Sequence, residues 1–417
     1  MYRCGPIKKF KSNLSSLAGN FIEYYDYTLY GFLATEINAH FFPPFADDKA
    51  LAFIRVYGVF FLGFLAKPIG SIFLSKIGDT YGRKKALFIS ILGMLLSTCM
   101  IGFSPSYEAI GGHATIVLIF ARMLQGACIS AEGDGVRVFA MEYWGDKKYC
   151  LANGFASLSC SGGIFTASYL ASLVLDFGFF WQWLFIAGGF LSLCILILRL
   201  TMDESPDFER VASEEKPSSN WCVFKKNKVL ILYMSLFAGL NGAIYYYLAV
   251  FINGYLADIL GIISQEAASQ ISNAYLFGYV SVTLIFGYFA DKVNKVKLIK
   301  ISSMGLMVTN IIMVSYAQEN YYPLYLFFLM GVFTYGIVVP IMPLMMSLTK
   351  VTDRFRVISI GHALGSMILG GTAPLIGSVL QDFTNSQTIT LVYPLVLSSC
   401  YLLIAILFNR KILSSST

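Results

Sequence analysis

Eight ionisable side chains stand within long apolar stretches of the first half of the chain, where a membrane-spanning helix would hold them at lipid depth. Each costs about 2.5–3.5 kcal/mol to insert at the bilayer centre, so eight unpaired charges would cost on the order of 20 kcal/mol. Because that exceeds a typical free energy of folding, these side chains must pair, face water, or do both. Ionisable groups placed in this way commonly carry protons or bind solutes. They are four acids and four bases: Glu23, Asp26, Glu132 and Asp134, against Arg55, Lys67, Arg122 and Arg137.

At about 100° per residue, two sets of mainly polar residues each fall on one face of a helix. The first face is about 120° wide and carries Asn20, Glu23, Asp26, Tyr27 and Tyr30. The second is about 80° wide and carries Arg122, Gln125, Ile129 and Glu132. Both faces are predicted to line a central cavity.

Glu132 and Arg122 are predicted to act together in proton coupling, because moving an arginine toward or away from a carboxyl changes its proton affinity. The alternative is a static buried pair that fixes the helix register. Glu23 and Asp26 either share this proton chemistry or pair structurally with Lys67.

Cationic side chains and tyrosines are the predicted substrate contacts. Lys67, Arg122 and Arg137 can bind a carboxylate. Asp134 and Arg137 form an i, i+3 pair, which favours structural pairing; the alternative is recognition of opposite charges on a substrate. Tyrosines of the second half suit quaternary ammonium groups, although they are equally typical of membrane-interface belts. The predicted substrate-binding residues are Lys67, Arg137, Asp134, Asn20, Tyr27, Tyr30, Gln125, Asn241 and Tyr245.

The elements that must position these residues follow from composition. Of 417 residues, 57% are hydrophobic, about 238 positions, which matches twelve helices of ~20 apolar residues. Only 13% are charged, against roughly 25% in soluble domains, so a cytosolic enzyme is excluded. A bilayer admits only helices or closed barrels, and the unbroken apolar run 186–198 does not alternate as a barrel strand would. An all-α membrane protein with twelve transmembrane helices is predicted, with spans 13–39, 51–74, 86–103, 115–139, 150–175, 181–199, 229–256, 270–290, 298–317, 322–348, 357–380 and 388–408.

The distribution of charge sets the predicted orientation. Of 30 Lys and Arg, 25 fall in the N-terminus, the even-to-odd loops with their adjoining helix ends, and the C-terminus. The opposite loops hold nine acids and only Lys49. The positive-inside rule therefore places both termini in the cytoplasm, and the net charge of +6 does not indicate nucleic acid. The eight cysteines form no CxxC pair, so free thiols are expected rather than disulfides or a metal site.

The polar segment 201–228 is predicted to be a cytoplasmic central loop, which divides the chain into an N-terminal six-helix bundle, 1–200, and a C-terminal one, 229–417. An internal repeat supports this division, because Asp79 and Asp291 lie 212 residues apart and each is followed six residues later by a Lys. Gly82 is matched by Asn294, and both residue types tolerate a left-handed turn.

The repeated loop is predicted to act as a gate. An Asp can bind free N–H groups at a helix end, and nearby cations can hold carbonyls, so the loop can latch one half against the other. The alternative is that these are ordinary positive-inside charges. The predicted gating residues are Gly78, Asp79, Gly82, Arg83, Lys85, Asp291 and Lys295.

These segments resemble the major facilitator superfamily: residues 78–85 are similar to its loop motif, and Arg122-Met-Leu-Gln125-Gly126 to its RxxQG motif. Segments 19–32, 67–70, 131–143 and 204–208 are similar to its metabolite:proton symporter branch, which includes proline/betaine, citrate and 2-oxoglutarate transporters. The resemblance covers the first half; in the second it rests mainly on the repeated loop. It implies two six-helix halves around a central site. The chain departs from the branch at residues 130–135 and at Lys67, where Arg is common. Asp134 and Arg137 are additional charges.

The predicted function is proton-coupled symport of a small polar solute, a carboxylate or a zwitterion such as betaine or proline, across the cytoplasmic (inner) membrane. The alternatives are a proton-driven exporter of a metabolite or polycarboxylate siderophore, and a non-transporting receptor, for which the central segment is short. An enzyme is not expected, since nucleophile, P-loop and metal spacings are missing. The expected partners are the solute, protons and the lipid bilayer. Neither a cofactor nor nucleic acid is expected, and the chain is expected to be a monomer.

Overall fold

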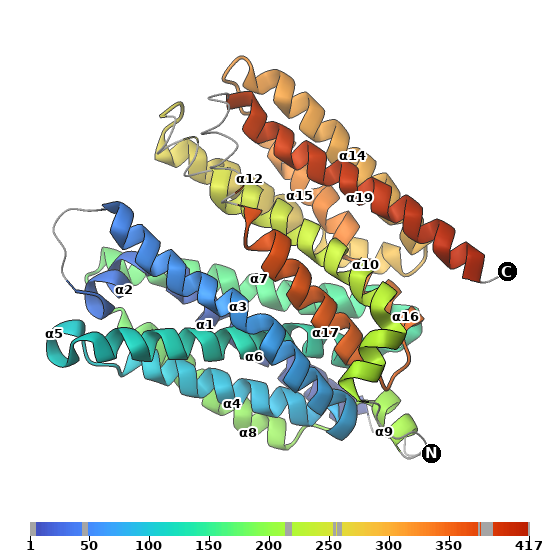
Figure 1. The fold of residues 1–417 in the computed structure, drawn as a ribbon, viewed down its shortest axis with the longest axis horizontal. Coiled ribbons are helices and arrows are strands. Elements are labelled where there is room, and N and C mark those ends of the chain that lie inside the picture. The colour runs from blue at the N-terminus through green and yellow to red at the C-terminus, as the bar shows by residue number, and fades with distance from the viewer. Residues whose placement is uncertain are drawn as a thin grey trace. The chain divides into compact units, whose positions relative to one another are not determined.

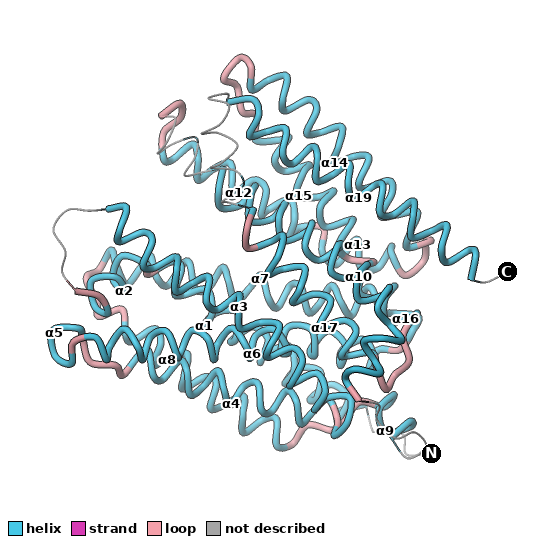
Figure 2. Tube along the Cα trace, in the orientation of Figure 1, coloured by secondary structure: helices cyan, strands magenta, loops and turns pink. Residues whose placement is uncertain are grey.

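The computed structural model describes residues 6–43, 49–212, 219–252, 256, 261–373, 376 and 387–415, and every regular element within them is helical (Figure 2). The chain divides into two compact units. Unit 1 contains Met1–Trp144, Ala156–Lys225 and Lys350–Ile360, and unit 2 contains Gly145–Phe155, Lys226–Thr349 and Gly361–Thr417. Each unit therefore includes a short segment from the other half of the sequence.

Unit 1 is a bundle in which α6 packs against α1, α3 and α4, and α8 packs against α1 and α4 (Figure 1). Small residues allow the closest approach, since Gly126 of α6 lies directly on the backbone of Gly63 of α3. Its helices are α1 (Pro6–Phe32), α2 (Ala34–Phe41), α3 (Lys49–Tyr81), α4 (Arg83–Gly102), α5 (Tyr107–Ile110), α6 (Gly112–Trp144), α7 (Tyr149–Asp176), α8 (Gln182–Leu200) and α9 (Pro206–Ala212). The first residues of α7 belong to unit 2.

Unit 2 is built in the same manner: α12 packs against α15, and α14 packs against α15 and α19. Gly331 of α15 lies against the backbone of Tyr275 in α12. Its elements are η1 (Asp146–Lys148), α10 (Asn220–Tyr246), η2 (Tyr247–Phe251), α12 (Gln265–Ser281), α13 (Thr283–Ala290), α14 (Lys295–Ala317), α15 (Leu324–Val338), α16 (Ile341–Leu348), α17 (Arg354–Gly365), η4 (Ser366–Gly370) and α19 (Gln387–Ser415). The starts of α10 and α17 belong to unit 1.

The part of the chain that the structure describes holds nine helices long and apolar enough to cross a membrane. They coincide with nine of the twelve predicted spans, from 51–74 to 322–348. The other three predicted spans fall on α1 with α2, on α17 with η4, and on α19, as far as those residues are described.

Helix boundaries differ from the predicted spans where local chemistry intervenes. The span 322–348 is two helices, because the chain turns at Val339 and Pro340, and a proline cannot continue the hydrogen-bond ladder. The central segment is not uniformly a loop, since α9 lies within 201–228 and α10 already begins at Asn220. The seven cysteines that the structure describes are free.

Candidate functional site

Asp26 of α1 and Arg122 of α6 lie at opposite ends of a continuous hydrogen-bonded chain in unit 1. Arg122 Nη1 donates to Gln125 Oε1 over 2.7 Å, and Gln125 Nε2 donates to Thr98 Oγ1 over 3.2 Å. Thr98 Oγ1 and Ser192 Oγ both donate to Asp26 Oδ2, over 3.1 and 3.2 Å. All five side chains are fully buried. A change of charge at Asp26 can therefore alter the electrostatic environment of Arg122, because the hydroxyl and amide groups between them can reorient.

Aromatic rings lie beside two cations, Arg122 at the end of this hydrogen-bonded series and Lys67. The Arg122 guanidinium lies 4.6 Å from the ring centre of Tyr27 and 4.2 Å from that of Tyr30. The Lys67 ammonium lies 4.0 Å from the ring centre of Phe64 and 5.2 Å from that of Tyr27. Lys67 is half-buried, whereas Arg122 is fully buried. The rings stabilise the two charges without neutralising them.

Glu132 pairs with a residue that the sequence analysis did not select. The prediction joined Glu132 to Arg122, but the structure joins it to Arg199 of α8, whose Nη1 donates to Glu132 Oε2 over 3.0 Å while Nη2 bonds Oε1. Both side chains are fully buried. Arg199 ends a buried stripe with Gly188, Ser192 and Ile195, and this spacing of three to four residues was the available signal. Its place at the helix end suggested an ordinary positive-inside cation instead.

The other unit 1 residues predicted to couple protons or bind the solute are buried or half-buried, and the side chain of Arg55 lies outside the part of the chain that the structure describes. The predicted alternative paired Glu23 and Asp26 with Lys67, but Glu23 contacts Ser90, and Asp26 contacts Thr98 and Ser192. Asn20 donates its amide to the carbonyl of Ala156, which ties α1 to α7. Asp134 is buried and acts electrostatically on Lys67, and Arg137 is half-buried.

In unit 2 the predicted residue Tyr245 belongs to a cluster of tyrosine rings. Its ring centre lies 6.4 Å from that of Tyr275 and 6.1 Å from that of Tyr279, and Tyr279 lies 5.0 Å from Tyr335. Tyr275 and Tyr335 are fully buried, whereas Tyr245, Tyr279 and the neighbouring Asn241 are half-buried. The partly exposed faces of the cluster are suited to a cationic group.

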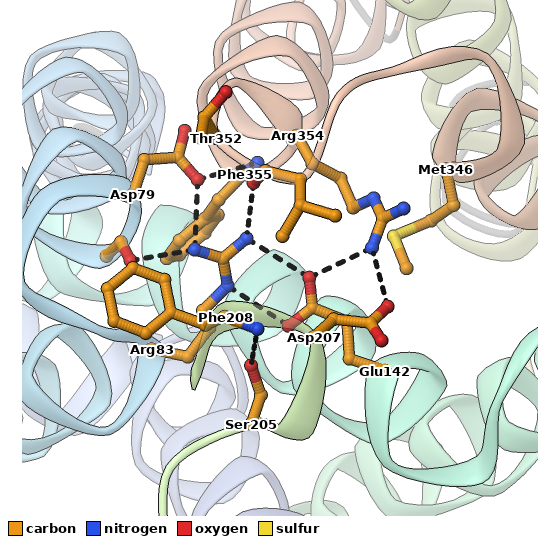
Figure 3. Close-up of polar contacts among 12 residues, drawn as sticks. Asp79, Arg83, Glu142, Ser205, Asp207, Phe208, Met346, Thr352, Arg354 and Phe355 are labelled. Carbon is orange, nitrogen blue, oxygen red and sulfur yellow. Dashed lines mark hydrogen bonds and ion pairs between the residues drawn. The ribbon is translucent and has the colours of Figure 1, made fainter. Parts of the chain in front are cut away.

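Arg83 lies at the centre of a second polar group in unit 1, here named the Arg83 cluster and formed with Asp79, Glu142, Asp207 and Arg354 (Figure 3). Arg83 Nε and Nη2 donate to the two oxygens of Glu142, each over 3.1 Å, and Nη1 lies 3.3 Å from Asp79. Arg354 Nη1 donates to Glu142 over 3.1 Å and to Asp207 over 3.2 Å. Glu142 thus lies between two arginines, whose charges compensate its own.

Asp79 and Asp291 each bind the start of a helix from the other half of the sequence. Asp79 accepts hydrogen bonds from the backbone N–H groups of Phe355 and Arg356 in α17, over 3.3 and 3.0 Å. Asp291 accepts from those of Cys150 and Leu151 in α7, over 2.8 and 3.0 Å. A carboxylate there satisfies N–H groups that lack an intrahelical partner and opposes the positive end of the helix dipole. The sequence repeat is therefore also a repeat of contacts.

The turn between α3 and α4 depends on Gly82 and Glu204. Gly82 has a φ of 108°, a conformation that favours glycine. Glu204 accepts hydrogen bonds from the backbone N–H groups of Arg83, over 2.9 Å, and Lys84. Burial raises the pKa of the Glu204 carboxyl, although the backbone N–H of Ser205 and the charge of Arg83 act against this. Glu204 thus fixes the start of α4, on which Arg83 stands.

Asn294 does not adopt the left-handed conformation predicted by analogy with Gly82. Its φ is −65°, and its side chain accepts a hydrogen bond from Lys297 N, so it caps α14 instead. Lys295 is the first residue of that helix. Lys85 is exposed, with its ammonium 4.8 Å from the ring centre of Tyr81.

The Asp291→Asn variant tests the helix-binding contacts in unit 2. An amide keeps one acceptor oxygen and loses the charge, so we expect the free energy of unfolding to fall by about 1 kcal/mol. Thermal unfolding in detergent measures this change. Glu319→Gln, at an exposed acid that follows α14, is the matched control and should leave the midpoint unchanged. Equal midpoints for the two variants would contradict a stabilising role for Asp291.

Comparison with known proteins places this geometry in context. The family described as Major Facilitator Superfamily matches residues 17–261. The chain is 29% identical over 388 residues to a protein of Staphylococcus haemolyticus (strain JCSC1435) named "Putative proline/betaine transporter", which covers 88% of this chain and 81% of that protein. It is 27% identical over 319 residues to the proline/betaine transporter of Escherichia coli (strain K12), which covers 72% of this chain and 63% of that protein.

A solved structure supports the fold independently. The chain superimposes on the proton:xylose symporter XylE, bound to 6-bromo-6-deoxy-D-glucose, with a TM-score of 0.77 over 97% of this chain and 96% of that one. The two are 14% identical, so this likeness concerns the fold alone. The predicted all-α membrane fold is confirmed.

Proposed function

Because the chain belongs to the Major Facilitator Superfamily, we propose that it is a proton-coupled symporter that imports a small zwitterionic or carboxylate solute by alternating access. It is a multi-pass membrane protein and a secondary transporter of a small solute. The similarity to proline/betaine transporters over 88% of the chain is the observation that carries the choice of solute. Proline and betaines join a carboxylate to a cationic nitrogen, so the first solutes to test are these.

The side chains of each unit support this choice. In unit 1, the half-buried Lys67 ammonium offers a charge-assisted hydrogen bond to a carboxylate. In unit 2, the rings of Tyr245 and Tyr279 offer cation–π contacts, and Asn241 adds a polar group beside them. Proton coupling is assigned to Glu132, Glu23 and Asp26, which are buried carboxyls at membrane depth, and to Arg122, which is linked to Asp26.

The contacts of Asp79 and Asp291 support a gating role for the repeated loop. Each carboxylate holds a helix start by two backbone hydrogen bonds that can break and re-form without a covalent step. Gly78, Gly82, Arg83, Lys85 and Lys295 complete the proposed gate. Both termini are assigned to the cytoplasmic side of the inner membrane on the positive-inside rule, and the working unit is a monomer.

Uptake by purified protein in proteoliposomes tests the proposal. With acid outside, we expect accumulation of radiolabelled proline or glycine betaine, and its collapse on addition of a protonophore. Citrate and 2-oxoglutarate complete the solute panel, and a sodium gradient at equal pH is the control for the coupling ion. Accumulation driven by sodium alone, or of none of the four solutes, would refute the proposal. Uptake that requires an acidic vesicle interior would identify an exporter instead.

A further inference from the structure

Glu23, Glu132, Arg199 and Ser90 meet in unit 1 from four different helices: α1, α6, α8 and α4. All four side chains are fully buried. Arg199 binds both oxygens of Glu132 and also donates to the carbonyl oxygen of Leu87. Ser90 Oγ lies 3.3 Å from Glu23 Oε1. These four side chains are named the Arg199 cluster.

The hydroxyl of Ser90 has one hydrogen but more than one oxygen within reach, and the carbonyl oxygen of Cys128 is nearer than Glu23 Oε1. Its oxygen is 2.9 Å from the carbonyl oxygen of Cys128, which can only accept a hydrogen bond. A serine hydroxyl carries one hydrogen and two acceptor lone pairs. When that hydrogen points to Cys128, the 3.3 Å contact with Glu23 is a hydrogen bond only if the Glu23 carboxyl is protonated and donates.

The count of charges independently favours a protonated Glu23. The groups that act electrostatically on Glu23 are Glu132, Arg199 and Asp26, and the Cys128 thiol lies beside both carboxyls. Asp26 stands one turn further along α1, where it is bonded to Thr98 and Ser192. Two carboxylates beside one guanidinium would leave an uncompensated negative charge in buried protein, which is strongly unfavourable. Glu142, which lies between Arg83 and Arg354, has no such deficit.

We propose that the Arg199 cluster binds a single exchangeable proton, carried in this structure by Glu23, and that Arg199 is the positioning residue that keeps Glu132 ionised. The assignment of this proton to transport rests on the proposed function; its presence does not. Loss of the proton leaves Glu23 and Glu132 to compete for one guanidinium. The cluster can thus exist in two arrangements that differ by one charge.

Gly19 of α1 provides the space for Arg199. A Cβ atom built on Gly19 would lie 3.0 Å from the guanidinium carbon of Arg199 and 3.2 Å from Glu132 Oε1. Any side chain at this position would therefore displace the guanidinium from its pair. Gly19, Arg199 and the two carboxyls are packed closely together. A small movement of α1 relative to α8 would therefore change the distances between these charges and, with them, the number of protons bound.

Infrared difference spectroscopy of the purified protein without solute tests the proton count directly. We expect Glu23→Gln to remove one protonated-carboxyl C=O band. Glu132→Gln should remove the same band, because Arg199 then neutralises the remaining Glu23 carboxylate. Glu142→Gln, the control at a carboxyl with two arginines, should leave the protonated-carboxyl region unchanged. A band due to Asp26 is identified separately by its loss in Asp26→Asn.

Arg199 variants separate positioning from folding. Arg199→Met should add a second protonated-carboxyl band, because no cation remains to keep Glu132 ionised. Arg199→Lys retains the charge and should show the single band of the original protein even if Arg199→Met does not fold. An unchanged band in Glu23→Gln, or two bands in Arg199→Lys, would overturn the proposal. These spectra need no transported solute, so a failed uptake assay rejects the proposed function and leaves the proton count to be judged by itself.

Discussion

Arg83→Gln is expected to lower the free energy of unfolding by about 3–5 kcal/mol and to abolish transport. Arg83 is fully buried, and its guanidinium bonds both oxygens of Glu142 and the carbonyl oxygens of Gly78 and Val351, besides its ion pair with Asp79. Removing the cation leaves Asp79 with Arg356 alone, and it leaves Glu142 with Arg354, which Asp207 shares, so three buried or partly buried acids depend on two buried arginines. The unfolding midpoint in detergent and uptake in proteoliposomes measure the two effects.

Two further substitutions show whether charge or geometry matters. Arg83→Lys keeps the charge but cannot bond Glu142 through two parallel N–H groups. Its unfolding midpoint and its uptake should therefore lie between those of the original protein and those of Arg83→Gln. Lys85→Gln, two residues further in the same predicted motif, removes an exposed cation and should change the stability by less than about 0.5 kcal/mol. Similar losses of stability and uptake in Arg83→Gln and Lys85→Gln would show that the motif acts only through its net charge.

The sequence predicts the fold and the importance of the repeated loop, but it does not predict which cation of the loop is buried. The apolar runs and the sorting of charges predict the helical membrane fold, since lipid permits few other solutions. The repeat predicts a role for Asp79 and Asp291, because a carboxylate near a helix end can bind backbone N–H groups that lack an intrahelical partner. Nothing in the local sequence distinguishes buried Arg83 from exposed Lys85. The partner of Arg83, Glu142, lies 59 residues away, and Arg354, which also bonds Glu142, lies 271 residues away.

Buried partners were harder to predict than buried charges. The intervals of three to seven residues along α6 predict that Arg122, Gln125 and Glu132 share one face of the helix, and all three side chains are buried. They could not indicate which cation from another helix reaches Glu132, because that depends on helix packing. Arg199 lies in the last turn of α8, where a long side chain usually extends to the membrane surface. Here it turns inward, because Gly19 leaves space and the Leu87 carbonyl accepts a hydrogen bond.

Glu132→Gln is expected to abolish accumulation driven by a proton gradient while the protein still folds. One proton crossing 100 mV supplies about 2.3 kcal/mol, which can support a solute gradient of about 50-fold. Without Glu132, the Glu23 carboxylate and Arg199 neutralise each other, so the cluster stays balanced but has no proton to exchange. The accumulation ratio should therefore fall to about one, with little change in the unfolding midpoint.

Counterflow identifies what the variant has lost. Exchange of labelled for unlabelled solute across vesicles at equal pH needs binding and the conformational change but no net proton movement, so Glu132→Gln should retain it. Glu108→Gln makes the same substitution at an exposed acid and should retain both exchange and accumulation. Loss of exchange together with accumulation would assign Glu132 to binding or folding. Accumulation at the level of the original protein would show that proton coupling does not depend on Glu132, and Asp26 would then be the carboxyl to examine.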